Sequence, residues 1–223
     1  MVTSAPFAGF PPQAWLFYEQ LTANNSREFF GAHRQEFETC VREPMIALTG
    51  ELTSEFGEFK IFRPHRDVRF SSDKSPYKTQ FGAVTEGEGG EFYYLHLDAD
   101  GLYAASGYHQ MAADQLGRFR QAVDGDHTGQ DLVNRVQSLE DTYSIGGSAL
   151  STAPRGFPRD HPRIRFLRHK GLTAGRHFGT PDWLSTSDAV RHVATAWRGA
   201  GPINEWLNAN VGPSHLPPEP GRR

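Results

Sequence analysis

The chain has 223 residues, with 23 Lys or Arg against 26 Asp or Glu, and its formal net charge is −3 at pH 7. Its apolar runs are far shorter than the roughly 20 residues that a membrane-spanning helix needs. The single cysteine, Cys40, cannot form a disulfide within the chain, and residues 1–10 lack the basic and apolar regions of a secretory signal peptide. We therefore expect a soluble, cytoplasmic protein without a cofactor, neither a disulfide scaffold nor a membrane protein.

Helical spacing dominates the first quarter of the chain. Asn25 and Glu28 have the spacing of a capping box, in which two side chains satisfy free backbone N–H groups at a helix start. Apolar residues then recur at steps of three, four or seven positions from Phe30 to Phe56. We predict one long amphipathic helix here, preceded by a short helix at residues 15–21, and we expect Pro44 to kink the long helix or to open its second half.

Strand-like segments follow in the middle of the chain. Three runs are typical of strands, Phe81–Thr85, Phe92–Asp98 and Leu102–His109, and an Asp-Gly pair between the last two is typical of a hairpin turn. Residues 66–70 are a candidate fourth strand. We predict an antiparallel β-meander of three to four or more strands, packed with one face on the long N-terminal helix.

The second half of the chain is expected to be mainly helical. Helical spacing covers residues 111–123, 130–139, 161–169 and 183–197, and a proline opens a last helix at residues 202–210. A long loop is expected at residues 143–158, which are rich in Gly and Pro, and an extended segment at residues 172–178.

The order of these elements favours the α+β class. We find no internal repeat and no convincing linker in the sequence, and we predict a single α+β domain over residues 12–210. The two ends, residues 1–11 and 212–223, contain several prolines and are expected to be flexible.

Basic residues concentrate in two segments of an otherwise acidic chain. Residues 60–78, the first basic segment, hold six Lys or Arg and two Asp, and residues 155–170, the second basic segment, hold six Lys or Arg and one Asp. Three of the four Lys residues lie in the first segment, although 19 of the 23 basic residues are Arg. Such local concentrations of positive charge attract anions.

Established catalytic and metal-binding motifs are missing from the sequence. There is no phosphate-binding Gly-Lys-Ser/Thr loop, Gly-x-Ser-x-Gly elbow, His-Glu-x-x-His helix or Cys pair for zinc, and we predict no metal site. His96, in the second predicted strand, faces the same side as Tyr94 and Asp98 because side chains alternate along a strand. It either lines a pocket or forms an ordinary hydrogen bond within the sheet.

Residues 66–79 form the most unusual polar run of the chain. If its first part is extended, Asp67 and Arg69 share one face and pair with each other. Two turns, one rich in Ser and Asp and one at a proline, then fold the run back on itself. A space suited to an anion would be surrounded by Arg66, Lys74, Tyr77 and Lys78. A solvated connection between helix and sheet is the other interpretation of this run.

Several runs of the sequence carry a resemblance to a known family. They are Arg-Asp-Val-Arg-Phe-Ser-x-Asp-Lys-Ser-Pro-Tyr-Lys-Thr at residues 66–79, Tyr-Tyr-Leu-His-Leu at 93–97, Asn-Asn-x-Arg-Glu-Phe-Phe at 24–30 and Pro-Arg-Gly-Phe-Pro-x-Asp-His-Pro at 154–162. Over roughly residues 12–210 the chain resembles the bacterial domain of unknown function 2461 family, although residues 107–110 lack the tryptophan and proline expected there. The resemblance implies family membership and a bacterial, cytosolic home, and it implies no catalytic residue.

The resemblance also joins the two basic segments, and we predict that they face each other across one cleft. The predicted ligand-binding residues are Arg66, Arg69, Lys74, Tyr77, Lys78, Arg155, His161 and Lys170. Asp67 and His161 are the candidate catalytic bases. Asp160 is expected to cap the helix that follows it and to leave His161 free.

A small phosphorylated or carboxylated ligand is the expected partner of such a cleft, with or without enzymatic turnover. Two alternatives stay open. Phe62, Phe70 and Tyr77 are interleaved with cations, which suits single-stranded nucleic acid, but the acidic remainder of the chain disfavours it. In the other alternative the protein is an interaction or scaffold module, and the charged run only fixes the helix to the sheet.

Overall fold

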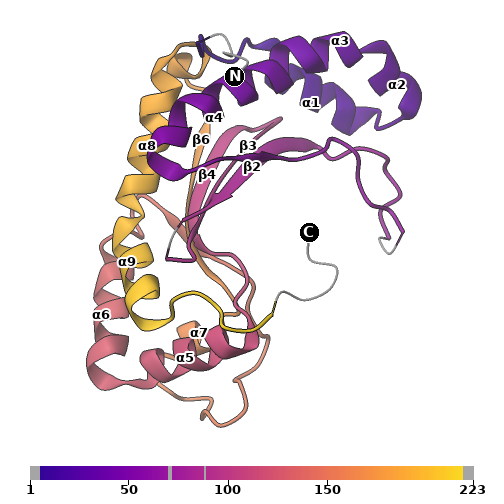
Figure 1. The fold of residues 1–223 in the computed structure, drawn as a ribbon. Helices are drawn as coiled ribbons and strands as arrows, with labels where there is room; N and C mark the ends of the chain where they lie inside the picture. The colour runs from indigo at the N-terminus through magenta and orange to yellow at the C-terminus, as the bar shows by residue number, and fades with distance from the viewer. Residues whose placement is uncertain (1–5, 70–71, 88, 218–223) are drawn as a thin grey trace. The chain divides into compact units, whose positions relative to one another are not determined.

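The computed structural model describes residues 6–69, 72–87 and 89–217 (Figure 1). Within these residues the chain forms helices and one six-stranded antiparallel sheet, with the strand order β1-β2-β3-β4-β6-β5. The strands are β1 (Lys60–Ile61), β2 (Gln80–Glu86), β3 (Phe92–Asp98), β4 (Gly101–Tyr108), β5 (Ser144–Gly146) and β6 (Leu172–Gly179). The predicted combination of helices with an antiparallel sheet is confirmed.

The predicted meander corresponds to β2, β3 and β4, whose bounds differ from the prediction by one residue at most. In the turn between β3 and β4, the Asp100 N–H donates to the Asp98 carboxylate (2.9 Å), and Gly101 has a φ of +104°. The predicted strand at residues 66–70 is wrong for the described residues 66–69, because the chain there pairs with itself, through His65 and Tyr77, instead of with β2. The strand beside β2 is the short β1.

The predicted long helix is divided into consecutive helical pieces. They are α2 (Arg27–Ala32), α3 (Arg34–Glu36), the π-helix η1 (Phe37–Arg42) and α4 (Glu43–Phe56), and α1 (Gln13–Ala23) precedes them. The prediction of one helix is therefore wrong. Pro44 lies in the first turn of α4, directly after the π-helix η1. Its predicted role of opening the second half is confirmed.

The start of α2 also differs from the prediction. Ser26 is the N-cap, and its hydroxyl accepts a hydrogen bond from the Phe29 N–H (3.1 Å). The predicted capping box of Asn25 and Glu28 is wrong because the Asn25 side chain binds the backbone of Tyr77.

The second half is largely helical, as predicted. Its helices are α5 (Ala113–Asp124), α6 (Asp126–Gln137), α7 (Ile164–Leu167), the 3₁₀-helix η2 (Asp182–Ser185), α8 (Asp188–Gly199) and α9 (Gly201–Asn210). The prediction missed the boundary between η2 and α8, and it missed β5 inside the expected loop of residues 143–158. The start of α9 beside its proline is confirmed.

The described residues separate into two compact units. Unit 1 draws on Met1–Thr85, Tyr93–Ala104 and His177–Trp197, and unit 2 draws on Glu86–Phe92, Ala105–Arg176 and Arg198–Arg223. The chain passes from one unit to the other within strands β2, β3, β4 and β6 and within helix α8. The single domain over residues 12–210 stays a prediction.

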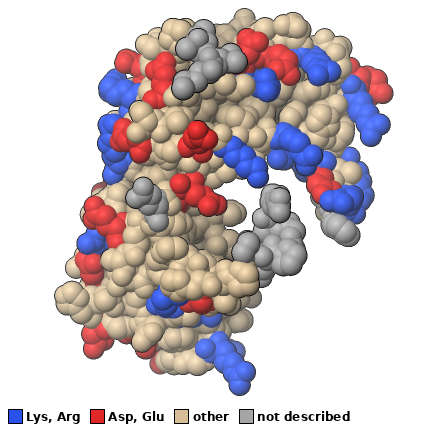
Figure 2. Space-filling model, viewed as in Figure 1, with Lys and Arg blue, Asp and Glu red and all other residues tan. Residues whose placement is uncertain are grey.

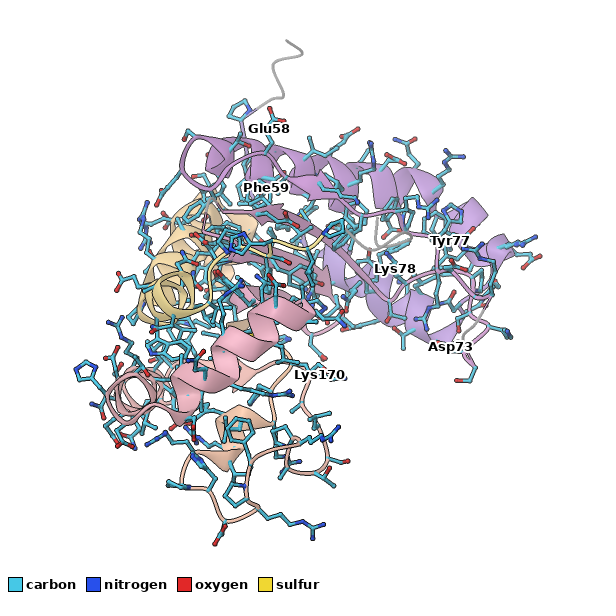
Figure 3. The ribbon with its side chains drawn as sticks, turned by 60° about the horizontal axis from the view of Figure 1, so that its bottom comes forward. Glu58, Phe59, Asp73, Tyr77, Lys78 and Lys170 are labelled. Carbon is cyan, nitrogen blue, oxygen red and sulfur yellow. The ribbon has the colours of Figure 1, made fainter. Side chains whose placement is uncertain are left out.

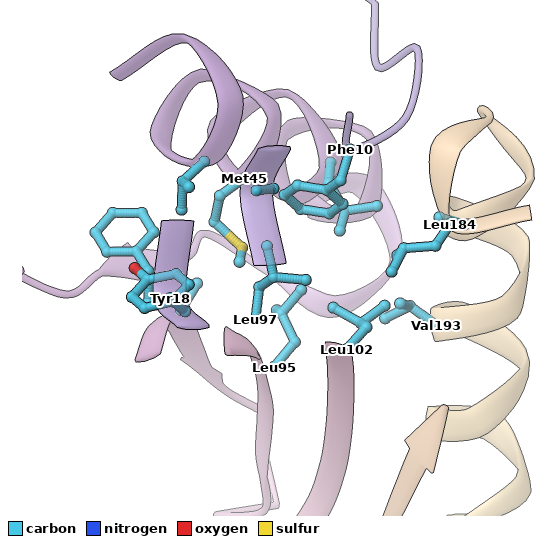
Figure 4. Packing of buried hydrophobic residues seen from close by; sticks show 14 of the residues in the cluster. Phe10, Tyr18, Met45, Leu95, Leu97, Leu102, Leu184 and Val193 are labelled. Atoms are coloured by element: carbon cyan, nitrogen blue, oxygen red, sulfur yellow. The ribbon is translucent and has the colours of Figure 1, made fainter. Parts of the chain in front are cut away.

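Unit 1 has a continuous hydrophobic core between its helices and one face of its strands (Figure 4). Tyr18 of α1, Met45 of α4 and Leu95 and Leu97 of β3 are buried in this core. Helices α1 and α4 lie over the same face of β2 and β3 (Figure 1). Because side chains alternate along a strand, Tyr94, His96 and Asp98 point to the opposite face.

In each segment predicted to be a flexible end, a described residue is held by a hydrogen bond. In unit 1, Phe10 is fully buried, and its N–H donates to the Leu184 carbonyl (2.9 Å). In unit 2, the Asp114 carboxylate on α5 accepts a hydrogen bond from the His215 N–H (2.9 Å). These contacts involve Phe10 and His215 alone, so the flexibility of the two ends stays a prediction, and the outermost residues lie outside the described part.

The close packing of the hairpin turn between β3 and β4 can be tested directly. Gly101→Ala places a side chain on a backbone with positive φ, and its Cβ would lie 2.0 Å from the Gly179 carbonyl oxygen. We expect the free energy of unfolding, measured in urea, to fall by about 1–3 kcal/mol.

The matched control is Gly50→Ala in α4, where an added Cβ meets nothing within 4 Å. This control should raise the free energy of unfolding by up to about 1 kcal/mol, because alanine favours a helix over glycine. Equal stability of Gly101→Ala and the unchanged chain would contradict the described turn.

Candidate functional site

Most of the first basic segment lies in a charged loop, residues 62–79. The two arms of this loop run side by side in unit 1. The Arg66 N–H donates to the Pro76 carbonyl (2.9 Å), and the Lys78 N–H donates to the Pro64 carbonyl (2.8 Å). In Figure 3, Asp73 lies far out on this loop, and Lys78 lies where the loop returns to the sheet. The two arms therefore fix where the loop's charges are placed.

Tyr77 anchors the charged loop to the N-terminal helices. The residue is 7% exposed, and its ring stacks on Phe30 at a centroid distance of 4.0 Å. The Asn25 amide donates to the Tyr77 carbonyl (3.0 Å) and accepts from the Tyr77 N–H (3.1 Å). Tyr77 was predicted to contact a ligand, and the structure places its ring in the core instead.

The charges in the outer part of the charged loop compensate one another. Arg69 donates to both carboxylate oxygens of Asp67, so the predicted pairing of these two residues is confirmed. Arg66 forms an ion pair with Asp73. The Lys74 ammonium donates to the Val68 carbonyl (3.0 Å). Figure 2 shows acidic and basic side chains intermixed on this part of the surface.

Asp67 is poorly suited to the predicted role of general base. Hydrogen bonds from the Arg69 side chain and backbone lower the pKa of Asp67 to about 2. A carboxylate with such a pKa is ionised at neutral pH but has little affinity for a proton. Its observed role is to hold Arg69.

Lys78 differs from the other cations of the charged loop. Its ammonium is partly buried and lies 5.1 Å from the centroid of the Phe62 ring. Burial lowers the pKa of Lys78, and the nearby charges of Arg63 and Arg66 lower it further. No carboxylate of the described residues pairs with it. Lys78 therefore has an unbalanced positive environment.

A set of polar and aromatic side chains continues from Lys78 across the strands of unit 1. The Phe62 ring lies 6.2 Å from the Tyr94 ring, and the Tyr94 hydroxyl accepts a hydrogen bond from the Gln80 amide (2.9 Å). This set, the polar face, consists of Gln80, Tyr94, His96, Asp98, Tyr103 and His177. It lies on the side of β3 opposite the buried leucines.

His96 is at the centre of the polar face. Its Nε2 lies 3.3 Å from the Asp98 carboxylate, and its ring stacks on Tyr103 at a centroid distance of 5.0 Å. The other ring nitrogen, Nδ1, is buried and has no hydrogen-bond partner. An imidazole held by a carboxylate at one nitrogen and open at the other can accept a hydrogen bond or a proton from a ligand.

The environment sets the protonation of the groups around His96. Burial alone would raise the pKa of Asp98, but the hydrogen bond from His96, together with the Asp100 N–H, lowers it below its ordinary value. Burial, and then the neighbouring Tyr103 and Asp98, raise the pKa of Tyr94 to about 12. Asp98 is therefore ionised at neutral pH, and the tyrosine keeps its proton.

The second basic segment, in unit 2, uses much of its charge to hold its own fold. Arg163 donates to the Val123 and Asp124 carbonyls at 2.6 and 2.7 Å. Arg168 donates to the Leu150 carbonyl (2.6 Å). Guanidinium groups that bind carbonyl oxygens in this way fix the chain around α7.

His161 is also engaged within unit 2. Its Nδ1 accepts from the Arg163 N–H (3.0 Å), and its Nε2 lies 3.1 Å from the Asp124 carboxylate. The prediction that His161 is left free is therefore wrong, because both ring nitrogens have partners. The predicted cap is wrong as well: α7 begins after Arg163, and Asp160 is not its N-cap.

Two further predicted ligand residues lie in unit 2. Arg155 is exposed, and Lys170, which is labelled in Figure 3, is partly buried. The backbone of Lys170 is fixed, since its N–H donates to the Ser148 carbonyl and its carbonyl accepts from the Met111 N–H. Lys74 and Lys78 belong to unit 1, so the cleft shared by both basic segments stays a prediction.

Sequence reasoning noticed only part of the polar face. The alternation along β3 placed His96 beside Tyr94 and Asp98, but Tyr103 and His177 were missed. The same alternation along β4 and β6 was available as a signal for those two residues. What the sequence lacks is the strand order, which places β4 beside both β3 and β6.

The described residues give no support for a metal site or for a membrane-spanning helix. No group of three His, Cys, Asp or Glu residues among them is arranged to hold a metal ion. In the same part of the chain, every helix is too short or too polar to cross a membrane.

The fold and the site define a mixed α and β protein in which a charged loop adjoins a polar, aromatic sheet face. Residues 13–206 match the model of the family described as "Conserved hypothetical protein (DUF2461)". The match covers most of the chain, so the protein belongs to this family, as the resemblance predicted. No curated protein and no solved structure matches the chain.

The anchor of the charged loop can be tested by Asn25→Ala. This change removes both hydrogen bonds to the Tyr77 backbone and should lower the free energy of unfolding by about 1–3 kcal/mol. Amide hydrogen exchange at Tyr77 and Lys78 should accelerate. The control is Asn24→Ala, an exposed position whose side chain makes no described hydrogen bond. Equal exchange in both variants would contradict the anchor.

The coupling between His96 and Asp98 can be tested by His96→Phe. The change keeps a ring against Tyr103 but removes the hydrogen bond that opposes burial, so the pKa of Asp98 should rise. Carbon-detected NMR of the Asp98 carboxyl measures it. The control, His177→Phe, removes a smaller influence and should produce a smaller rise. An unchanged pKa in His96→Phe would show that no such coupling exists.

The sign of the pH dependence of the stability follows from the lowered pKa of Asp98. Because folding lowers the pKa of Asp98, its ionised form stabilises the fold above the unfolded pKa of about 3.9. This contribution is lost as the pH falls through the lower pKa of the folded state.

Proposed function

We propose that the protein binds a small anionic ligand, phosphorylated or carboxylated, at Lys78 beside the polar face of unit 1. The observation that carries this proposal is the environment of Lys78. Its ammonium is partly buried among cations, and no described carboxylate pairs with it. Burying a positive charge without a counter-charge is unfavourable. A bound anion would supply that counter-charge.

The other cations of the charged loop support the choice of Lys78. Arg66 and Arg69 already have carboxylate partners, and Lys74 binds a backbone carbonyl. An anion bound at any of these three has to compete with an existing partner. Arg63 is exposed and close enough to Lys78 to lower its pKa. We therefore propose Lys78 and Arg63 as the main anion contacts, with Arg66 adding positive potential.

The nucleic-acid alternative has less support. It requires aromatic side chains on which bases can stack. The Tyr77 ring is buried against Phe30, and the Phe62 ring lies beneath the Lys78 ammonium. The scaffold alternative explains part of the motif, because Asn25 and Tyr77 join the charged loop to the helices. It does not explain why a lysine is partly buried among other cations.

Isothermal titration calorimetry of the full chain with inorganic phosphate and with propionate tests the proposal. Lys78→Met should weaken binding of the anion by about tenfold or more, because a charge-assisted hydrogen bond contributes about 1.5–3 kcal/mol. Lys74→Met is the matched control: its ammonium is exposed and already bound to a carbonyl, and its loss should change the affinity less than about threefold.

The same titration has outcomes that would overturn the proposal. One is equal affinity of Lys78→Met and the unchanged chain. The other is no binding of either anion at millimolar concentration. Thermal unfolding should show that Lys78→Met is at least as stable as the unchanged chain, because the variant removes repulsion among Lys78, Arg63 and Arg66.

A further inference from the structure

Unit 2 has a cavity of about 300 Å³, formed by α7 and residues of the loop before it. This loop cavity is lined by Ser151, Thr152, Ala153, Arg159, Ile164 and Arg168. Ser151, Thr152 and Arg159 are exposed, so the cavity is open to solvent. Its volume is at the lower end of the range of small-molecule sites, which suits a small ligand.

The lining of the loop cavity is positively charged. Arg159 and Arg168 contribute two guanidinium groups, and no Asp or Glu of the described residues lines the cavity. Neither of them has a carboxylate partner in the described part of the chain, whereas Arg163 and Arg165 each have one. Two cations without a counter-charge on the protein attract an anion to this position.

The backbone beside the loop cavity is fixed by a reciprocal contact between Leu150 and Arg168. The Leu150 N–H donates to the Arg168 carbonyl (2.8 Å), and the Arg168 Nε donates to the Leu150 carbonyl (2.6 Å). The second bond orients the guanidinium group and leaves its two terminal nitrogens free to donate to a ligand. A group that is already oriented loses less conformational entropy when a ligand binds.

The other lining groups narrow the class of anion. The hydroxyls of Ser151 and Thr152 make no described hydrogen bond, and each can donate one. A phosphate monoester carries a charge of about −1.5 to −2 at pH 7 and three acceptor oxygens. It therefore matches two guanidinium groups and two hydroxyls better than a carboxylate, which has a single charge and two oxygens.

From these observations we infer that the loop cavity binds a phosphate monoester with a small organic group. Arg159 and Arg168 bind the phosphate group, and the organic group lies against Ala153 and Ile164, the apolar part of the lining. This is a second anion site, in unit 2, and the inference does not rest on the function proposed at Lys78.

Calorimetry of the full chain carrying Lys78→Met tests the inference, because this variant lacks the main anion contact proposed in unit 1. The probe is butyl phosphate, at about pH 8 so that the phosphate is a dianion. Pentanoate has the same butyl group on a carboxylate, and inorganic phosphate has no organic group. Butyl phosphate should bind about tenfold more tightly than pentanoate and about threefold more tightly than inorganic phosphate.

Variants of two exposed arginines locate the site. Arg159→Met, added to Lys78→Met, should weaken the binding of butyl phosphate by about tenfold. The matched control is Arg155→Met, which removes an exposed cation of the same basic segment that does not line the cavity. It should change the affinity less than about threefold. Neither arginine makes a described hydrogen bond or ion pair, so both variants should keep the melting temperature.

NMR of the unchanged chain gives an independent location. The backbone amide signals of Thr152 and Ala153 should shift when butyl phosphate is added, and they should not shift when it is added to Arg159→Met at the same concentration. Shifts of equal size in both proteins would contradict the site.

The outcomes separate this inference from the proposed function. The inference is overturned if butyl phosphate does not bind the Lys78→Met chain at millimolar concentration, if Arg159→Met and Arg155→Met weaken it equally, or if pentanoate or inorganic phosphate binds as tightly. Because a carboxylate binds the loop cavity weakly, the propionate titration reports on Lys78. Loss of propionate binding in Lys78→Met therefore supports the proposed function whether or not the loop cavity binds butyl phosphate.

Discussion

The site depends on the difference between the two faces of strand β3, one apolar and one polar. One side of the strand buries Leu95 and Leu97 in the core of unit 1, and the other side carries Tyr94, His96 and Asp98. A shift of the strand by one residue would exchange the two faces and place a carboxylate in the core, at a large free-energy cost. The apolar side therefore fixes the register, and the register places the polar side chains together.

In the charged loop, the pairing of charges has a comparable role. In its outer part each charge has a partner within a few residues, such as Asp67 for Arg69. At its base, Lys78 has the ring of Phe62 below it and cations beside it. A stable protein tolerates such an imbalance where a ligand or another group restores the balance, and perturbed ionisable groups accordingly cluster at functional sites. The imbalance, more than the number of basic residues, distinguishes this position.

Features that depend on local spacing could be predicted from the sequence. The alternation of β3, the Asp-Gly turn before β4 and the proline at the start of α9 are local signals, and the structure has all of them. The pairing of Asp67 with Arg69 could also be predicted, because the two residues lie only two positions apart.

Features decided by distant partners could not be predicted. Asn25 and Ser26 are both good helix caps, and the choice between them depends on the Tyr77 backbone, 52 residues away. His161 was predicted to be free because its partner Asp124 lies 37 residues earlier, at the end of α5. The polar face needed the strand order, which joins β4 to β6 across a long stretch of sequence.

The central claim is that Lys78 is held in an unbalanced positive environment which a bound anion completes. The most direct measurement is an NMR titration of the Lys78 ammonium in the full chain, with and without inorganic phosphate. The account predicts a pKa below the ordinary lysine value in the free protein and a rise when phosphate is added. A pKa at the ordinary value that phosphate does not change would contradict it.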